Sequence, residues 1–352
     1  MKKRFFAFFS VILLSFISLF SFNACGCVGA QAISFNDAFV KGYKGNVPTN
    51  YFEKLTYEVN YRDDMYDYTI SDKLDSDKFT FSKGEYTTEL SIIDEIPIDS
   101  LKDNEIYKSL AKTDKIYSYK TLFTIPVSYK TFEGEKSFND KIETITYFCS
   151  QGMSFAPIYS NTKATYSIFS YVDGKYNATK ESYQSTFVYG IDYYTLTLKA
   201  NDIEAQTTEH EYDYKCLIDN TQLLFAVRNL GLSKDTAISF DVSSATYKDK
   251  TNLAVYYVEE QTESTKQNGS YPGLTYNGVK VEEDVKVDKL RYKVNSTSNS
   301  GKEHFVFIKN SSTNGVLPNN AYMLKYVQPL ICYGNFEVMG SLEFSLVNIS
   351  QA

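Results

Sequence analysis

The chain has 352 residues, of which 43% are apolar, and carries 36 basic and 43 acidic side chains for a formal net charge of −7. Removing residues 1–24 takes away Lys2, Lys3 and Arg4 and no acid, which leaves 33 basic and 43 acidic residues and a net charge of −10. We therefore expect no nucleic-acid partner and no charge-driven binding to an anionic membrane surface, because both need clustered Lys and Arg.

The first 24 residues are typical of an export signal. Three basic residues precede an apolar run from Phe5 to Phe22 that is broken only by serines. An uncleaved membrane anchor is the alternative for a run of this length, although small residues and cysteines follow it at once. Both alternatives place the rest of the chain outside the cytoplasm.

The signal ends in Phe22-Asn23-Ala24-Cys25, which resembles the lipobox of bacterial lipoproteins. The resemblance implies that Cys25 is acylated, becomes the mature N-terminus and anchors the protein to the outer face of a membrane. Phe22 departs from the family pattern, in which Leu is usual at that position. Two alternatives stay open: Cys27 is the acylated residue, or a signal peptidase releases a soluble chain after Ala30-Gln31-Ala32.

Period-two alternation of apolar residues dominates the chain after a short helix predicted over 34–41. A strand over 55–61 is expected to form a hairpin with 66–70. The next hairpin joins 79–81 to 86–92 through a turn at Lys83-Gly84.

A helix is predicted over 100–112, followed by a strand over 116–132. Pro126 lies inside that strand and has no amide donor, so we expect it at an edge or a bulge. The alternation predicts further strands, with turns at Glu133-Gly134 and Asp173-Gly174. These strands cover 142–148, 164–172, 185–199, 211–217, 238–242, 253–258, 279–294, 304–308, 322–326 and 336–347.

The strongest helical pattern covers 220–230. Asp219 or Asn220 offers an N-cap, apolar residues recur at helical spacing, and Gly231 can end the helix. A lone helix of this length is marginal in water, so it must pack on a sheet. We predict a mainly β (α+β) fold: a large curved antiparallel sheet or half-barrel with a few helices, one of them on the concave face.

The predicted domain organisation has four parts. Residues 1–24 are the signal peptide, 25–33 a lipidated tether and 34–259 the main β-rich domain. The polar run 259–271 is the best linker, and residues 260–352 are either closing strands of the same sheet or a small β subdomain.

Three segments resemble exported lipoprotein-carrier β half-barrels of the LolA/LppX-like type. They are Tyr147-Phe148, 156–160 and 219–230, with Val227 where the family motif has Leu. The resemblance implies an apolar concavity that holds an acyl chain or a similar ligand. Leu223, Leu224 and Val227 would face this ligand.

Residues for catalysis or metal binding are sparse. His210 and His304 each neighbour a Glu but lack a second histidine at ligand spacing. The sequence lacks the motifs of common hydrolases and nucleotide-binding enzymes, so we expect no cofactor, no metal and a protein that is not an enzyme. A divergent hydrolase with converging carboxylates stays an alternative.

Cysteines and tyrosines leave two questions open. Cys149, Cys216 and Cys332 form no CxxC pair, so we expect buried core residues, although export permits a disulfide. The 31 Tyr and 25 Phe fit strand preference. The alternative function is a structural or adhesive surface module that binds a protein or polysaccharide through exposed tyrosines.

Overall fold

The structure is a computed structural model. It describes residues 31–33, 50–62, 78–112, 114–151, 154–201, 203, 205–212, 217–227, 236–243, 251–269, 271–294, 304–308, 322–333 and 336–352. The signal 1–24, both acylation candidates Cys25 and Cys27, the helix expected over 34–41 and the strand expected over 66–70 lie outside these residues.

The described residues form nineteen strands that join one sheet. In chain order they are β1 (Gln31–Ile33), β2 (Phe52–Arg62), β3 (Phe79–Phe81), β4 (Gly84–Ile93), β5 (Ile116–Thr131), β6 (Gly134–Gln151), β7 (Ser154–Val172), β8 (Lys175–Tyr189), β9 (Tyr193–Ala200), β10 (Gln206–Glu211), β11 (Leu217–Asp219), β12 (Thr236–Ser243), β13 (Thr251–Ser264), β14 (Leu274–Tyr276), β15 (Val279–Val281), β16 (Asp284–Val294), β17 (His304–Ile308), β18 (Tyr322–Tyr333) and β19 (Phe336–Gln351).

Most neighbouring strands are antiparallel. One series of pairs runs from β10 through β9, β8, β7, β6, β5 and β4 to β2. It continues through β19, β18, β17, β16 and β13 to β12. β1 and β11 add to β12 in parallel, and the β14–β15 hairpin joins β19 through a parallel pair.

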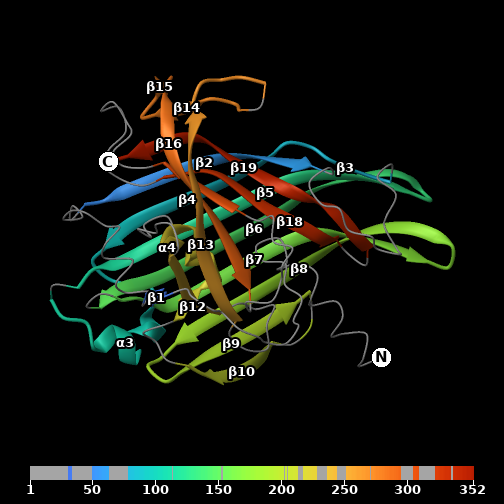
Figure 1. Cartoon of the computed structure of the whole chain (residues 1–352). Helices are drawn as coiled ribbons and strands as arrows, with labels where there is room; N and C mark the ends of the chain where they lie inside the picture. Colours follow the sequence, from blue (N-terminus) through green and yellow to red (C-terminus); the bar gives the residue numbers. More distant parts are fainter. Residues whose placement is uncertain are drawn as a thin grey trace.

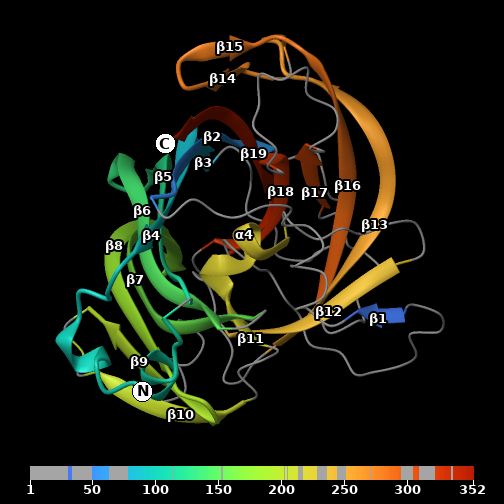
Figure 2. The same cartoon turned by 90° about the vertical axis from the view of Figure 1, so that its left-hand side faces the viewer.

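The sheet curls around the short helix α4 (Leu223–Val227), which lies inside the curve (Figures 1 and 2). The sheet therefore has a concave inner face and a convex outer face. The prediction of a mainly β fold with a curved, largely antiparallel sheet and a helix on its concave face is confirmed.

Aromatic side chains fill the inner face. In β2, Leu55, Tyr57 and Val59 are buried and alternate with half-buried residues, as the strand period of two predicts. Tyr57 packs on Tyr86 with ring centroids 5.8 Å apart, and Tyr86 packs on Phe344 of β19 at 5.6 Å. Each ring buries roughly 150–250 Å², so these aromatic residues dominate the core.

The predicted hairpin around Lys83-Gly84 is wrong. β3 and β4 both pair with β5, through contacts such as Phe81 with Val127 and Glu85 with Thr124. β3 and β4 therefore run in the same direction along β5, one after the other, and residues 82–83 separate them.

Gly84 and Pro126 lie where this interruption meets β5. The amide of Ser82 donates to the carbonyl oxygen of Pro126 at 2.9 Å, so the proline faces an irregular segment, which matches the predicted bulge. A Cβ on Gly84 would lie 2.6 Å from the carbonyl oxygen of Thr124. Gly84 is needed for close approach of two strands and not for a turn.

The helix predicted over 100–112 is replaced by two short pieces, the 3-10 turn η2 (Asp99–Leu101) and α3 (Glu105–Lys108). Asn104 separates them, with extended backbone at φ −61° and ψ 135°. Its side-chain oxygen accepts from the amide of Tyr107 at 3.1 Å and its amide donates to the carbonyl of Tyr189 at 2.6 Å. A polar residue used as an N-cap thus breaks the expected helix.

The helix predicted over 220–230 begins where expected. Asp219 caps the 3-10 turn η3 (Asn220–Gln222), which leads into α4. Residues 228–231, including the predicted end at Gly231, lie outside the described residues.

Several predicted boundaries shift. The run 185–199 is two strands, β8 and β9, because the chain turns between Gly190 and Tyr193, where the Gly190 amide donates to the Tyr193 carbonyl at 2.9 Å. The turns at Gly134 (φ 115°), Asp173 (φ 52°) and Gly174 (φ 76°) lie where predicted.

The polar run that begins at residue 259 starts as strand. β13 continues to Ser264 and pairs with β16 along this stretch, for example Glu260 with Asp288. The strands after residue 260 continue the same sheet. The last of them, β19, pairs with β2, which lies near the N-terminal end of the described residues.

Candidate functional site

The interior of the curved sheet holds α4, which carries the predicted ligand contacts. Leu223, Leu224 and Val227 are all buried there, together with Phe225 and Ala226. The structure thus brings the three predicted residues together on the concave side of the sheet (Figure 2).

Phe225 connects α4 to the sheet. Its ring centroid lies 6.0 Å from that of Tyr119 in β5 and 5.6 Å from that of Phe148 in β6. Phe148 in turn stacks on Tyr117 at 5.0 Å. The contact between helix and sheet is therefore aromatic and apolar.

A buried polar cluster holds the N-terminal end of this helical segment. The Asp219 carboxylate accepts from the amide of Thr221 at 2.9 Å, and the amide of Asp219 donates to the side-chain oxygen of Gln222 at 2.8 Å. The hydroxyl of Tyr189 also donates to Asp219 and lies 2.6 Å from the hydroxyl of Ser243. This capping box fixes where the helical segment begins.

Burial controls the protonation of this cluster. It raises the pKa of Asp219, although hydrogen bonds from Thr221 and Tyr189 work against the shift. Burial and the neighbouring Asp219 carboxylate raise the pKa of Tyr189 well above its usual value. Tyr189 therefore stays protonated and donates a hydrogen bond to Asp219.

Hydroxyl groups extend the polar cluster along the inner face of β6 and β7. Thr146 lies 2.5 Å from the hydroxyl of Thr221 and donates to Ser160 at 3.2 Å, and Thr144 lies 3.0 Å from Thr162. The concave face thus combines an aromatic region with a narrow row of hydroxyls.

A second buried carboxylate, Asp140, lies apart from this cluster. It accepts from the amide of Ser167 at 2.8 Å and from its hydroxyl at 3.0 Å, and Tyr129 lies 3.0 Å from the same hydroxyl. Burial raises the pKa of Asp140 from 3.8 to about 7, against the hydrogen bonds from Ser167 and the charge of Lys180.

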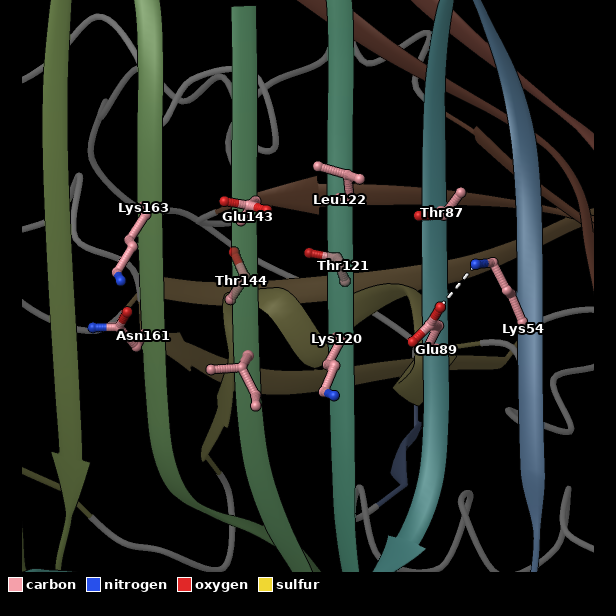
Figure 3. A pocket seen from close by; sticks show the side chains of 11 residues that line it. Lys54, Thr87, Glu89, Lys120, Thr121, Leu122, Glu143, Thr144, Asn161 and Lys163 are labelled. Carbon is pink, nitrogen blue, oxygen red and sulfur yellow. Dashed lines mark hydrogen bonds and ion pairs between the residues drawn. The ribbon is translucent and has the colours of Figure 1, made fainter. Parts of the chain in front are cut away.

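The outer face has a hollow of about 390 Å³ over β2, β4, β5, β6 and β7 (Figure 3). Lys54 and Glu89 form an ion pair of 2.8 Å at one end. Lys120 and Lys163 line the rest, with Leu122 and Ile145 between them. The hollow is open and has both charged and aliphatic side chains in its lining, and neither Asp140 nor Asp219 lines it.

Sequence reasoning missed most of these groups. The capping box could be predicted from the Asp219-x-x-Gln222 spacing, but nothing local connects Asp219 to Tyr189 or Asp140 to Ser167. Each pair is made by strands that meet only in the folded sheet.

The tyrosines lie mainly inside. Of those whose side chains the structure describes, Tyr193 alone is classed as exposed, at 42%. The surface tyrosines required by an adhesive module are thus scarce in this part of the chain.

The histidine and cysteine expectations are tested in part. His210 stacks on Tyr194 with centroids 5.0 Å apart and lies 3.0 Å from the Thr208 hydroxyl. Cys149 is a buried core residue, while the side chains of His304, Cys216 and Cys332 lie outside the described set. Among the described residues there is no cluster of three or more His, Cys, Asp or Glu that could hold a metal ion.

None of the helices in the described segments has the length and apolar character of a membrane span.

Comparison with known proteins gives one structural neighbour. No family model matches the chain, and no curated protein does. The neighbour is the crystal structure of a β-barrel-like protein of a domain of unknown function (DUF1849) from Brucella abortus, with a TM-score of 0.41 and 10% identity over 87% of this chain and 100% of that one.

Proposed function

We propose that this chain is an exported protein, anchored to the outer face of a membrane through Cys25, that binds an apolar or amphipathic ligand in the concavity of its sheet. The observation that carries the proposal is α4, whose five residues are all apolar and all buried against the aromatic inner face. Leu223, Leu224 and Val227 are the proposed ligand contacts.

The ligand enters between α4 and the sheet. Separating them breaks the contacts of Phe225 with Tyr119 and Phe148, each worth about 0.5–1.5 kcal/mol. An acyl chain with about ten buried methylenes contributes roughly 8 kcal/mol and covers the apolar surface that the separation exposes. The hydroxyls of Thr144 and Thr162 offer hydrogen-bond partners for the polar end of an amphipathic ligand.

The first test is native mass spectrometry with lipid extraction on the mature chain purified from a bacterial host. A co-purified acyl species is the expected result. A fluorescent fatty acid should then bind saturably to delipidated protein and be displaced by unlabelled lipid. Absence of saturable binding would refute the proposal.

Two substitutions locate the ligand. Leu224→Ala should weaken binding of the fluorescent fatty acid about tenfold, since roughly 1.4 kcal/mol of apolar contact is lost. Leu122→Ala, a matched change on the outer face, should leave binding unchanged. Because the chain has no Trp, Phe225→Trp gives a unique emission that should shift when lipid enters, whereas an unchanged emission would place the ligand elsewhere.

A further inference from the structure

Three lysines form a line across the outer face. Lys120 of β5, Lys163 of β7 and Lys199 of β9 are exposed and lie on alternate strands. Lys163 pairs with Gln184 of β8, which pairs with Lys199. Lys120 lies one row away, opposite Ile145 of β6. Neighbouring strands are about 4.8 Å apart, so successive lysines are roughly 10 Å apart across the sheet.

These three residues, the lysine strip, outnumber the acids that face them: Glu89 is the cross-strand neighbour of Lys120, and Glu143 is that of Lys163. None of them forms an ion pair with a residue in the described part of the chain. The two acids beside them already have partners: Glu89 pairs with Lys54 at 2.8 Å and Glu143 pairs with Lys141 at 2.8 Å. A positive strip thus stands on a chain whose net charge is −7.

Neutral hydrogen-bonding groups lie along the strip. Asn161 donates to the hydroxyl of Thr186 at 2.7 Å, Thr186 pairs with Thr197, and Thr197 lies 2.9 Å from the hydroxyl of Thr207. The hollow of about 390 Å³ occupies one end, where side chains of Leu122 and Ile145 provide an aliphatic floor (Figure 3).

We propose that the lysine strip and its hollow bind an anionic polysaccharide that carries carboxylate groups. The lysines would meet the carboxylates, Asn161 and the threonines the hydroxyls, and the aliphatic floor the apolar faces of sugar rings. Single-stranded nucleic acids are bound through aromatic stacking, and protein hot spots are rich in Trp, Tyr and Arg. The strip and its row of Asn and Thr residues contain none of these side chains.

The position of β1 indicates which way the lysine strip would face relative to the membrane. β1 lies on β12, on the opposite side of α4 from β6, β7 and β8 (Figure 2). Residues 26–30 alone separate Cys25 from β1, and five residues span at most about 18 Å. An anchor at Cys25 would therefore hold the β12 side near the membrane and turn the strip outward. This orientation rests on the proposed function, whereas binding by the strip does not.

The test measures binding of the mature full-length chain, in nonionic detergent, to immobilised alginate and to neutral dextran. We expect binding to alginate that weakens as salt rises, and none to dextran. The triple variant Lys120→Gln, Lys163→Gln and Lys199→Gln should bind alginate at least about tenfold more weakly, because three exposed charge pairs are lost. The matched control Lys112→Gln, Lys266→Gln and Lys280→Gln removes the same charge elsewhere and should bind normally.

Four results would overturn the proposal. The first two are that alginate is not bound, or that dextran is bound equally well. Both triple variants lose binding to the same extent, which would indicate net charge and not the strip. Phosphatidylglycerol vesicles displace alginate and bind the chain more tightly, which would make the strip a membrane contact. The strip variant should keep its affinity for the fluorescent fatty acid, so failure here is distinguishable from failure of the interior ligand site.

Discussion

Asp140 should make the stability of the fold depend on pH. It is 4% exposed and accepts two hydrogen bonds from Ser167. The hydroxyl hydrogens of Tyr129 and Ser167 can point either way along the hydrogen-bonded series Tyr129–Ser167–Asp140. The neutral acid can therefore donate to Ser167, and the ionised acid accepts from it. Burial nevertheless disfavours the ionised form and raises the pKa of Asp140 from 3.8 to about 7.

The size and sign of the effect follow from this shift. Because the pKa is higher in the folded state, the folded chain binds more protons between pH 3.8 and about 7. The stability contribution is fully present below pH 3.8 and is lost as the pH rises through 7. About three pH units at 1.36 kcal/mol each give a loss of roughly 4 kcal/mol.

The assay compares urea unfolding of the wild type and Asp140→Asn from pH 4 to pH 8. Asn keeps an acceptor for Ser167 but does not ionise, so the variant should gain about 4 kcal/mol relative to the wild type across this range. Taking the difference at each pH removes the contribution of Asp219, whose pKa burial also raises. A difference that stays constant with pH would refute the reasoning, whatever the absolute stabilities.

Three further predictions test other parts of the molecule. Gly84→Ala should lower the unfolding free energy by about 1–3 kcal/mol in urea titrations, because its Cβ would lie 2.6 Å from the carbonyl oxygen of Thr124. A neutral effect would show that the strands can move apart. Tyr189→Phe removes the hydroxyl that Asp219 accepts from and should cost about 1.5–3 kcal/mol by the same measurement; unchanged stability would mean that the cap does not need it. Cys25→Ser should move the exported chain from the membrane fraction to the soluble fraction on immunoblots, and a variant that stays membrane-bound would contradict acylation at this cysteine.

The sequence alone determined part of the local structure. Alternation in β2 follows from the strand period, and Asp219 marks the start of the helical segment through its capping residues. The turn at Asp173-Gly174 follows from residues that accept positive φ. A mainly β fold with one buried helix could be predicted because each of these signals lies within a few residues.

The tertiary structure decided which strands meet. β3 and β4 lie along β5 instead of forming a hairpin, and β2 lies beside β19, where Arg62 pairs with Glu343 at 3.0 Å. The polar groups of interest arise the same way: Tyr189 meets Asp219, and three lysines line up on alternate strands. The strand period and the helix caps depend on residues that are close in sequence. The order of the strands depends on how the whole sheet buries its inner face, which local sequence does not determine.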